Sequence, residues 1–343
     1  MYTTGRLLFD MAGPVRFRRS TQRWDEDRVR RDLLTPLDDR FGARLTTPKI
    51  DGPRGYRARR IEMDNGDLAL FAWNDDGAYW LGNTETPETL WRTDKETFDE
   101  ALFEVGRWAQ RELTYDLQRQ APWLAAYEYV SWFFLSVLFS KDGRETTRAF
   151  FDRDAAGFPD ATREEGLEFY ERLLKTGVLD EHRYTMAAKL GTSERNEFGR
   201  MRATMGEFDA AKLLADAGIP FVPESERDSG HALDFAVETP GGERLVEVTR
   251  PMAPRNRPAG TAIAALRRTV DSKTRDQLAI HDDAVLFVDC TSFRDDEWNP
   301  IRAERPSVGY QPTVVFRYRP DGRCEGYRHG DVPLDLDGAI EWV

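Results

Sequence analysis

The chain is poor in lysine, histidine and cysteine. Only 7 of its 49 basic residues are lysines, and its 343 residues include 4 histidines and 2 cysteines. Two cysteines, Cys290 and Cys324, are too few for a disulfide framework or a cysteine-type zinc site. Scarce lysine on an acidic chain resembles proteins from salt-loving archaea, whose hydrated carboxylates keep the surface soluble.

The sequence also lacks an apolar run suited to a membrane span. Its longest apolar stretch, residues 122–140, is interrupted by Glu128 and predicts a buried core helix. The N-terminal stretch is broken by Asp10 and Pro14, so we expect no signal peptide. These features predict a cytoplasmic protein with no membrane partner.

The formal net charge of −12 is spread evenly along the chain and excludes a basic footprint that covers a whole face. Contact with nucleic acid would therefore need local basic patches. The clusters RFRR (16–19) and RGYRARR (54–60) are candidates for phosphate contacts, and solvated faces are the alternative.

The order of predicted elements divides the chain into three regions. Residues 1–95 read as a small α+β region, with strand-like runs separated by the hairpin signals Asn-Gly and Asp-Asp-Gly. Residues 96–198 read as mostly helical, with helices near 96–119, 122–140, 144–155 and 162–176, the last ending at Gly177. A helix, turn and short strand within 143–190 also allow a winged helix that binds DNA; a helical packing module is the alternative.

Residues 199–343 predict an α/β domain. Its expected order is a helix (201–217), a strand (219–223), a hairpin (232–249), a helix (259–280) and strands at 284–290 and 313–319. The run AVLFVDC is continuously apolar, as expected for a strand that is covered on both faces. A mixed sheet between helices is therefore predicted.

The hairpin LDFAVETPGGERLVEVTRP (233–251) places two carboxylates side by side. If it is symmetric about Pro240 and Gly241, Asp234 lies directly opposite Glu247, where like charges destabilise a sheet. A divalent cation bridging both carboxylates would turn that repulsion into ligation. An exposed acidic pair on a half-solvated sheet is the alternative.

Two predicted helices carry polar residues on their apolar faces. Glu207 lies on the face of Ala210, Ala211 and Leu214. Lys273 and Gln277 continue the stripe of Ala262, Leu266 and Val270. The alternatives are a first-turn glutamate favoured by the helix dipole and a lysine that extends to solvent. Together with the hairpin, we expect these side chains to converge on one face of one sheet.

This order of elements and residues, over about 200–290, resembles the PD-(D/E)xK nuclease superfamily. The resemblance implies a restriction-endonuclease-like α-β-β-β-α-β core with a mixed sheet. It also implies that Asp234 and Glu247 ligate Mg²⁺ or Mn²⁺ with the carbonyl of Val248, and that Glu207 assists through a second metal ion or a water. His231 is a candidate extra ligand, with a turn histidine as the alternative.

The sequence departs from the family pattern at one position. The family's lysine, two residues after the second carboxylate, is Thr249 here. Lys273, with Gln277, is expected to supply the positive charge from the facing helix instead. Arg250, Arg255 and Arg257 follow in a Pro-rich loop and are candidate phosphate contacts; a solvated arginine loop is the alternative.

The resulting hypothesis is a metal-dependent nuclease that hydrolyses nucleic acid, DNA rather than RNA. Its expected catalytic residues are Glu207, Asp234, Glu247, Lys273 and Gln277. The alternative, favoured by Thr249, is a nuclease-like domain without catalysis that binds nucleic acid or protein. A homodimer is compatible with both.

Overall fold

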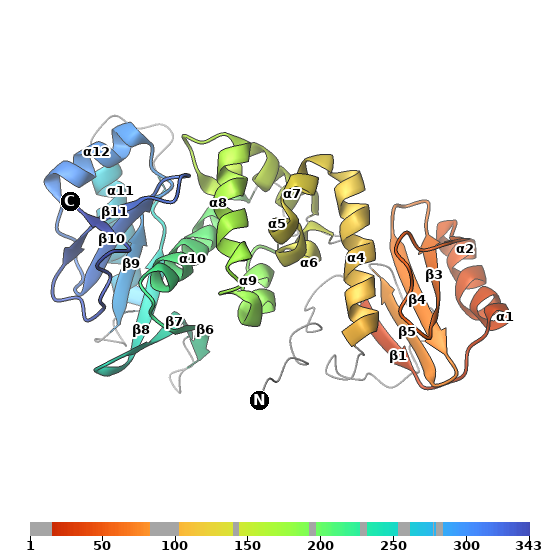
Figure 1. The fold of residues 1–343 in the computed structure, drawn as a ribbon. Coiled ribbons are helices and arrows are strands. Elements are labelled where there is room, and N and C mark those ends of the chain that lie inside the picture. The colour runs from red at the N-terminus through yellow and green to blue at the C-terminus, as the bar shows by residue number, and fades with distance from the viewer. Residues whose placement is uncertain are drawn as a thin grey trace. The chain divides into compact units, whose positions relative to one another are not determined.

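The computed structural model describes residues 16–82, 103–139, 144–191, 197–226, 232–252, 261–276, 278 and 284–343. The chain divides into two compact units, residues 1–145 with 191–193 and residues 146–190 with 194–343 (Figure 1). The helical region predicted between two other domains is therefore shared between these units. Its first helices belong with the N-terminal sheet, and its last helices belong with the C-terminal sheet.

The first unit is built on a five-stranded antiparallel sheet in the order β1-β5-β4-β3-β2. The strands are β1 (Arg16–Ser20), β2 (Arg44–Thr46), β3 (Arg57–Glu62), β4 (Leu68–Asn74) and β5 (Gly77–Gly82). The predicted Asn-Gly and Asp-Asp-Gly turns join β3 to β4 and β4 to β5, which confirms both hairpins.

Helices pack on this sheet. The continuous helical segment α1 (Glu26–Arg28), η1 (Val29–Leu34) and α2 (Thr35–Phe41) contributes Val29, Leu33 and Leu37 to a buried core with Phe71 and Trp80. Helix α4 (Phe103–Gln120) contributes Glu112 and Asp116, which pair with the buried Arg60 of β3 at 3.3 and 2.6 Å. The sheet therefore has both a packed apolar core and a buried ion pair.

The apolar stretch predicted as one core helix forms three short ones: η3 (Pro122–Ala126), α5 (Glu128–Phe133) and α6 (Leu135–Leu138). The single-helix prediction is wrong because the backbone leaves helical angles at Tyr127 and Phe134. Its burial is confirmed, since Leu124, Val130 and Leu138 are fully buried. No described helix is long and apolar enough to cross a membrane.

The second unit begins with a helical layer. It contains α7 (Arg144–Arg153), η4 (Ala155–Gly157), α8 (Arg163–Lys175), η5 (Asp180–His182) and α9 (Arg183–Ala188). Gly177 follows α8 with a φ of +74°, the left-handed geometry expected of a helix stop. Residues 144–191 are all described and contain no strand, so the winged-helix prediction for 143–190 is not supported.

A seven-stranded mixed sheet in the order β12-β11-β10-β9-β8-β7-β6 forms the centre of this unit. Its strands are β6 (Phe221–Glu226), β7 (Ala232–Thr239), β8 (Gly242–Thr249), β9 (Val285–Asp289), β10 (Thr313–Tyr318), β11 (Cys324–His329) and β12 (Glu341–Trp342). Strands β6, β7 and β8 form an antiparallel meander, and β9 pairs parallel with both β8 and β10.

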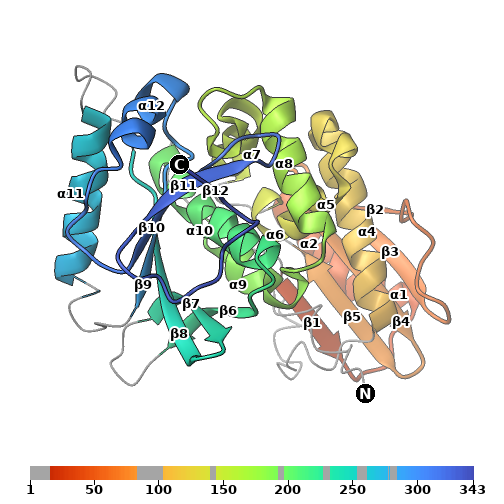
Figure 2. The ribbon, with the colours of Figure 1, turned by 60° about the vertical axis from the view of Figure 1, so that its left-hand side comes forward.

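Helices cover both faces of this sheet, as Figure 2 shows. Helix α10 (Phe198–Asp216) lies on one face; α11 (Thr261–Asp276) and α12 (Asp295–Glu304) lie on the other. Residues of α11 and α12 share a core with Leu245 of β8 and with Leu286 and Val288 of β9. The mixed α/β architecture is therefore present, and the elements from α10 to β9 follow the predicted order; α12, β11 and β12 were not predicted.

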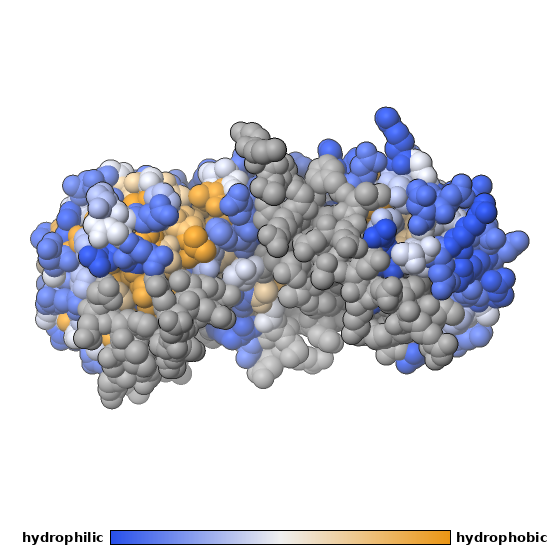
Figure 3. All heavy atoms as spheres, turned by 90° about the horizontal axis from the view of Figure 1, so that it is seen from below, coloured by the Kyte–Doolittle hydropathy of each residue, from blue (hydrophilic) through white to orange (hydrophobic). Residues whose placement is uncertain are grey.

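The hydropathy of the described surface differs between the two units. Seen from below, the first unit is almost entirely hydrophilic, whereas the second shows apolar patches between hydrophilic areas (Figure 3). A hydrophilic surface agrees with the negative net charge and the high charged content of 32%.

Candidate metal centre

The β7–β8 hairpin has the register that the sequence predicts. Its ladder runs from Thr239 opposite Gly242 to Phe235 opposite Val246. The ladder ends there, one residue short of Asp234 and Glu247. Glu247 lies two residues from Leu245 and therefore on the same face of β8, the face that α11 covers. Asp234 is close enough for its charge to act on Glu247.

The backbone ladder between β7 and β8 ends where the carboxylates begin. Beyond Phe235, the Val248 N–H donates a hydrogen bond of 2.8 Å to Asp234 Oδ2 instead of to a backbone carbonyl. Strand β7 nevertheless continues to pair with β6 as far as Ala232. The two strands therefore separate at this point, and the Asp234 carboxylate bridges them.

Lys273 lies beside the second carboxylate. It continues the apolar stripe of α11 that includes Leu266 and Val270, and this spacing turns its side chain toward the sheet. The Lys273 Nζ lies 2.5 Å from Glu247 Oε1. A lysine on the facing helix therefore reaches the hairpin, as the sequence predicts.

Glu247 is buried and only partly satisfied. Its exposed fraction is 1%, and its Oε2 has no hydrogen-bond partner among the described residues. Burial, and next the negative charge of Asp234, raise the pKa of Glu247 to about 7, against the opposing effect of Lys273. The site thus holds two repelling carboxylates and one buried oxygen available as an acceptor.

This pKa predicts a pH-dependent stability for the metal-free chain. Because the folded pKa lies above the ordinary 4.5, protonated Glu247 stabilises the fold at low pH, and this contribution is lost as the pH rises through about 7. As the pH rises from about 5 to about 8, the free energy of unfolding of the wild type should fall by about 3 kcal/mol more than that of Glu247→Gln. Urea unfolding in EDTA at about pH 5 and about pH 8 tests this. A difference between the two proteins that does not change with pH would contradict it.

The structure does not bring Glu207 to these residues. Glu207 lies on α10, on the other face of the sheet, and its carboxylate forms an ion pair with Lys189 that follows α9. The expected convergence on one face is therefore wrong for this residue. Among the described residues, no group of three or more carboxylate, histidine or cysteine side chains could hold a metal ion. Gln277, His231, Arg255 and Arg257 lie outside the described residues.

Arg250 is not a surface phosphate contact. Its side chain is fully buried on the α10 face, 3.3 Å from both Asp209 Oδ2 and Asp289 Oδ2. It also donates hydrogen bonds to Ser292 Oγ (2.7 Å) and the Gly157 carbonyl (3.1 Å). The prediction fails because Arg250 reaches residues from distant segments that the sequence does not show to be neighbours.

The two aspartates beside Arg250 interact with each other. Burial, and next the charge of Asp289, raise the pKa of Asp209 well above its usual range. The Tyr170 hydroxyl donates a 2.9 Å hydrogen bond to Asp209 Oδ1. Asp209 lies outside the apolar stripe of Glu207, Ala210 and Leu214, yet it is fully buried. The apolar run before Asp289 was the signal that this carboxylate would be buried.

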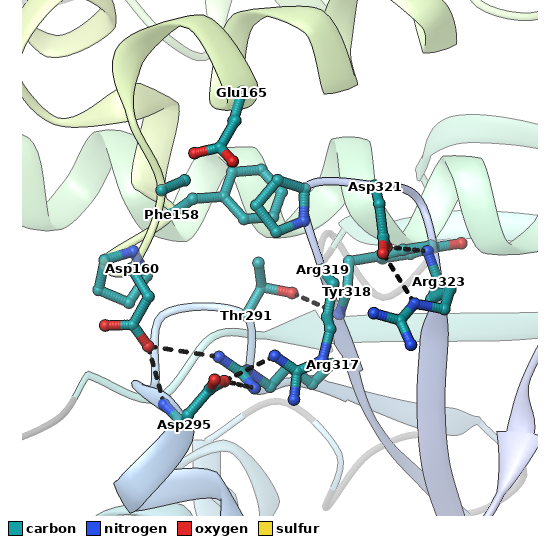
Figure 4. Close-up of a pocket in the computed structure, with 13 residues that line it drawn as sticks. Phe158, Asp160, Glu165, Thr291, Asp295, Arg317, Tyr318, Arg319, Asp321 and Arg323 are labelled. Carbon is teal, nitrogen blue, oxygen red and sulfur yellow. Dashed lines mark hydrogen bonds and ion pairs between the residues drawn. The ribbon is translucent and has the colours of Figure 1, made fainter.

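A separate polar pocket of about 240 Å³ lies near the ends of β9 and β10 (Figure 4). Its arginines are already engaged by carboxylates. Arg317 and Arg319 lie 2.7 and 2.8 Å from Asp295 Oδ1, and Arg323 lies 2.7 Å from Asp321. A phosphate would have to displace these partners, so this pocket is a weaker candidate site than the hairpin.

Comparison with known proteins places the chain in one family. A model described as "Family of unknown function (DUF5784)" matches residues 12–336. The chain belongs to the DUF5784 family. No curated protein and no solved structure matches it. The DUF5784 match spans both units, so the family includes both the N-terminal sheet and the hairpin that carries the two carboxylates.

Proposed function

We propose that this DUF5784 protein is a metal-dependent nuclease that hydrolyses phosphodiester bonds of nucleic acid, DNA rather than RNA. The observation that carries the proposal is the 2.5 Å contact of Lys273 with Glu247, next to Val248, whose N–H donates a hydrogen bond to Asp234. The order α10, β6, β7, β8, α11, β9 supports a restriction-endonuclease-like core for this unit.

The residues fit a hard divalent cation. Mg²⁺ is commonly held by one or two carboxylates, while waters and substrate phosphates fill its other positions. Asp234 and Glu247 supply two carboxylates, and the buried Glu247 Oε2 has no other partner among the described residues. Bound there, Mg²⁺ or Mn²⁺ would lower the pKa of a water and offset charge that develops on the phosphate.

Lys273 is the candidate positioning cation. Its ammonium contacts Glu247, and its side chain is 30% exposed. A cation in this place would orient the attacking water and stabilise negative charge in the transition state. Thr249, which is buried on the same face as Glu247, carries no charge and cannot do this.

The test is cleavage of plasmid and single-stranded DNA with Mg²⁺ or Mn²⁺ at high salt. We expect activity in the wild type and its loss in Asp234→Asn, because one of the two metal ligands is removed. Glu238→Gln is the matched control, since Glu238 is an exposed carboxylate on the same strand. Cleavage that is equal in Asp234→Asn and the wild type would refute the assignment.

The second candidate is a nuclease-like domain without catalysis. The pairing of Glu207 with Lys189 favours it, because that carboxylate is engaged away from the hairpin. This candidate predicts neither cleavage nor stabilisation by Mn²⁺. Mn²⁺-dependent stabilisation of the wild type that disappears in Glu247→Gln would count against it.

A further inference from the structure

The N-terminal unit contains a pocket of about 590 Å³ beside a tight turn. The residues that line it include Arg23, Asp25, Gly55, Tyr56, Arg57 and Asp75. A volume of this size falls in the range of roughly 300–1,000 Å³ that is typical of small-molecule sites. All of these residues belong to the first unit, away from the candidate metal centre in sequence.

The turn holds its side chains in a defined arrangement. The Tyr56 N–H donates a 3.0 Å hydrogen bond to the Pro53 carbonyl, and Gly55 has a φ of +82°. These features define a type II turn, which requires a residue such as glycine with positive φ at its third position. Arg54 precedes this glycine, and Tyr56 and Arg57 lead directly into β3.

The arginines of the cluster 54–60 divide into two groups. Arg59 pairs with Glu26, and Arg60 pairs with Glu62, Glu112 and Asp116, so these two arginines are structural. Arg54 and Arg57 are exposed and form no ion pair with any residue that the structure describes. Arg57 lines the pocket and Arg54 lies in the turn beside it, so two guanidinium groups are available to a ligand.

The acidic residues of the pocket have other partners. Asp25 accepts a hydrogen bond from the Arg28 N–H as the cap of α1, and Asp75 pairs with Arg23 at 3.3 Å. With Arg54 in the adjoining turn, three arginines face two aspartates at this end of the sheet, and Arg54 and Arg57 have no carboxylate partner among the described residues. Phosphate is a suitable ligand for such guanidinium groups because it can accept two parallel hydrogen bonds from each.

Tyr56 adds an aromatic surface between these arginines. It is partly exposed, and its ring makes an edge contact with Tyr79, with ring centroids 5.9 Å apart. Tyr79 is buried and helps to fix the ring. Aromatic rings flanked by arginines bind unpaired strands, because bases stack on the ring while phosphates contact the guanidinium groups.

We propose that this pocket binds a single-stranded segment of nucleic acid, with a base on Tyr56 and phosphates on Arg54 and Arg57. A base within a duplex is stacked on its neighbours and cannot reach such a ring, so an unpaired strand is the expected ligand. The proposal rests on the proposed function only in naming the form of the substrate. Its evidence lies entirely in the first unit.

The test is the affinity of the full chain for a labelled oligothymidylate, measured by fluorescence anisotropy in EDTA, where a metal-dependent reaction is blocked. We expect Tyr56→Leu to bind at least about fivefold more weakly and Tyr56→Phe to bind like the wild type. Arg57→Gln should weaken binding and reduce the slope of log affinity against log salt by about 0.7. The controls are Tyr115→Leu and Arg44→Gln, which alter an exposed tyrosine and an exposed arginine elsewhere in this unit.

The outcomes separate this proposal from the proposed function. Weaker binding in Tyr56→Leu with normal binding in Glu247→Gln supports the pocket even if no cleavage is found. Equal loss in Tyr56→Phe and Tyr56→Leu, or no loss in either, would overturn it. Tighter binding of a duplex than of the single strand would also overturn it, and oligouridylate in place of oligothymidylate distinguishes RNA from DNA as the ligand.

Discussion

Arg250→Met is expected to destabilise the second unit by about 3–5 kcal/mol, the usual cost of removing one partner from a buried ion pair. The change would leave Asp209 and Asp289 buried together without the cation that lies 3.3 Å from each. One carboxylate would have to be protonated or the fold would have to open. The measurement is urea unfolding, compared with Arg268→Met, which alters an exposed arginine of α11.

A second substitution sharpens this test. Asp209→Asn removes one of the two buried negative charges, so it should restore part of the stability lost in Arg250→Met. Combined variants therefore measure the coupling between these residues rather than the loss of one side chain. Equal unfolding midpoints for Arg250→Met and Arg268→Met would contradict the description of this cluster.

Lys273→Ala is expected to reduce metal-dependent cleavage by about 10²-fold or more, the usual effect of losing a group that stabilises charge in a transition state. The variant Lys273→Ala with Thr249→Lys should recover much of this activity. Thr249 lies on the face of Glu247, so a lysine there would direct its ammonium toward the same carboxylate.

Lys212→Ala is the matched control, because Lys212 pairs with Asp216 on α10, on the other face of the sheet. Its cleavage should equal that of the wild type. Activity of Lys273→Ala that matches this control would remove Lys273 from the mechanism. Failure of Thr249→Lys to restore any activity would show that the charge is needed from the helix alone.

The sequence was sufficient to predict the register of the hairpin and the contact of Lys273 with it. A Pro-Gly-Gly turn fixes strand pairing, and the two-residue period of a strand then fixes which side chains share a face. The predicted register agrees with the pairing of Phe235 with Val246. Helical spacing likewise placed Lys273 on the face that packs on the sheet.

The sequence could not supply contacts between distant segments. Periodicity places Glu207 on the packed face of its helix, but it does not reveal that Lys189 is its partner or that α10 and α11 cover opposite faces. In the sequence, Arg250 follows a strand and resembles a solvated residue. In the fold, it lies between the buried carboxylates of Asp209 and Asp289. Burial of a charge depends on the neighbours that the fold assembles, which local patterns do not encode.

The proposed nuclease requires a divalent metal site formed by Asp234 and Glu247. Electron paramagnetic resonance of free Mn²⁺ tests it directly, because bound Mn²⁺ loses its solution signal. We expect Mn²⁺ to bind to the wild type and to the Glu238→Gln/Glu243→Gln variant, which alters the exposed acidic pair of the same hairpin. We expect no Mn²⁺ binding by Asp234→Asn/Glu247→Gln. Equal Mn²⁺ binding by all three proteins, or binding by none, would contradict it.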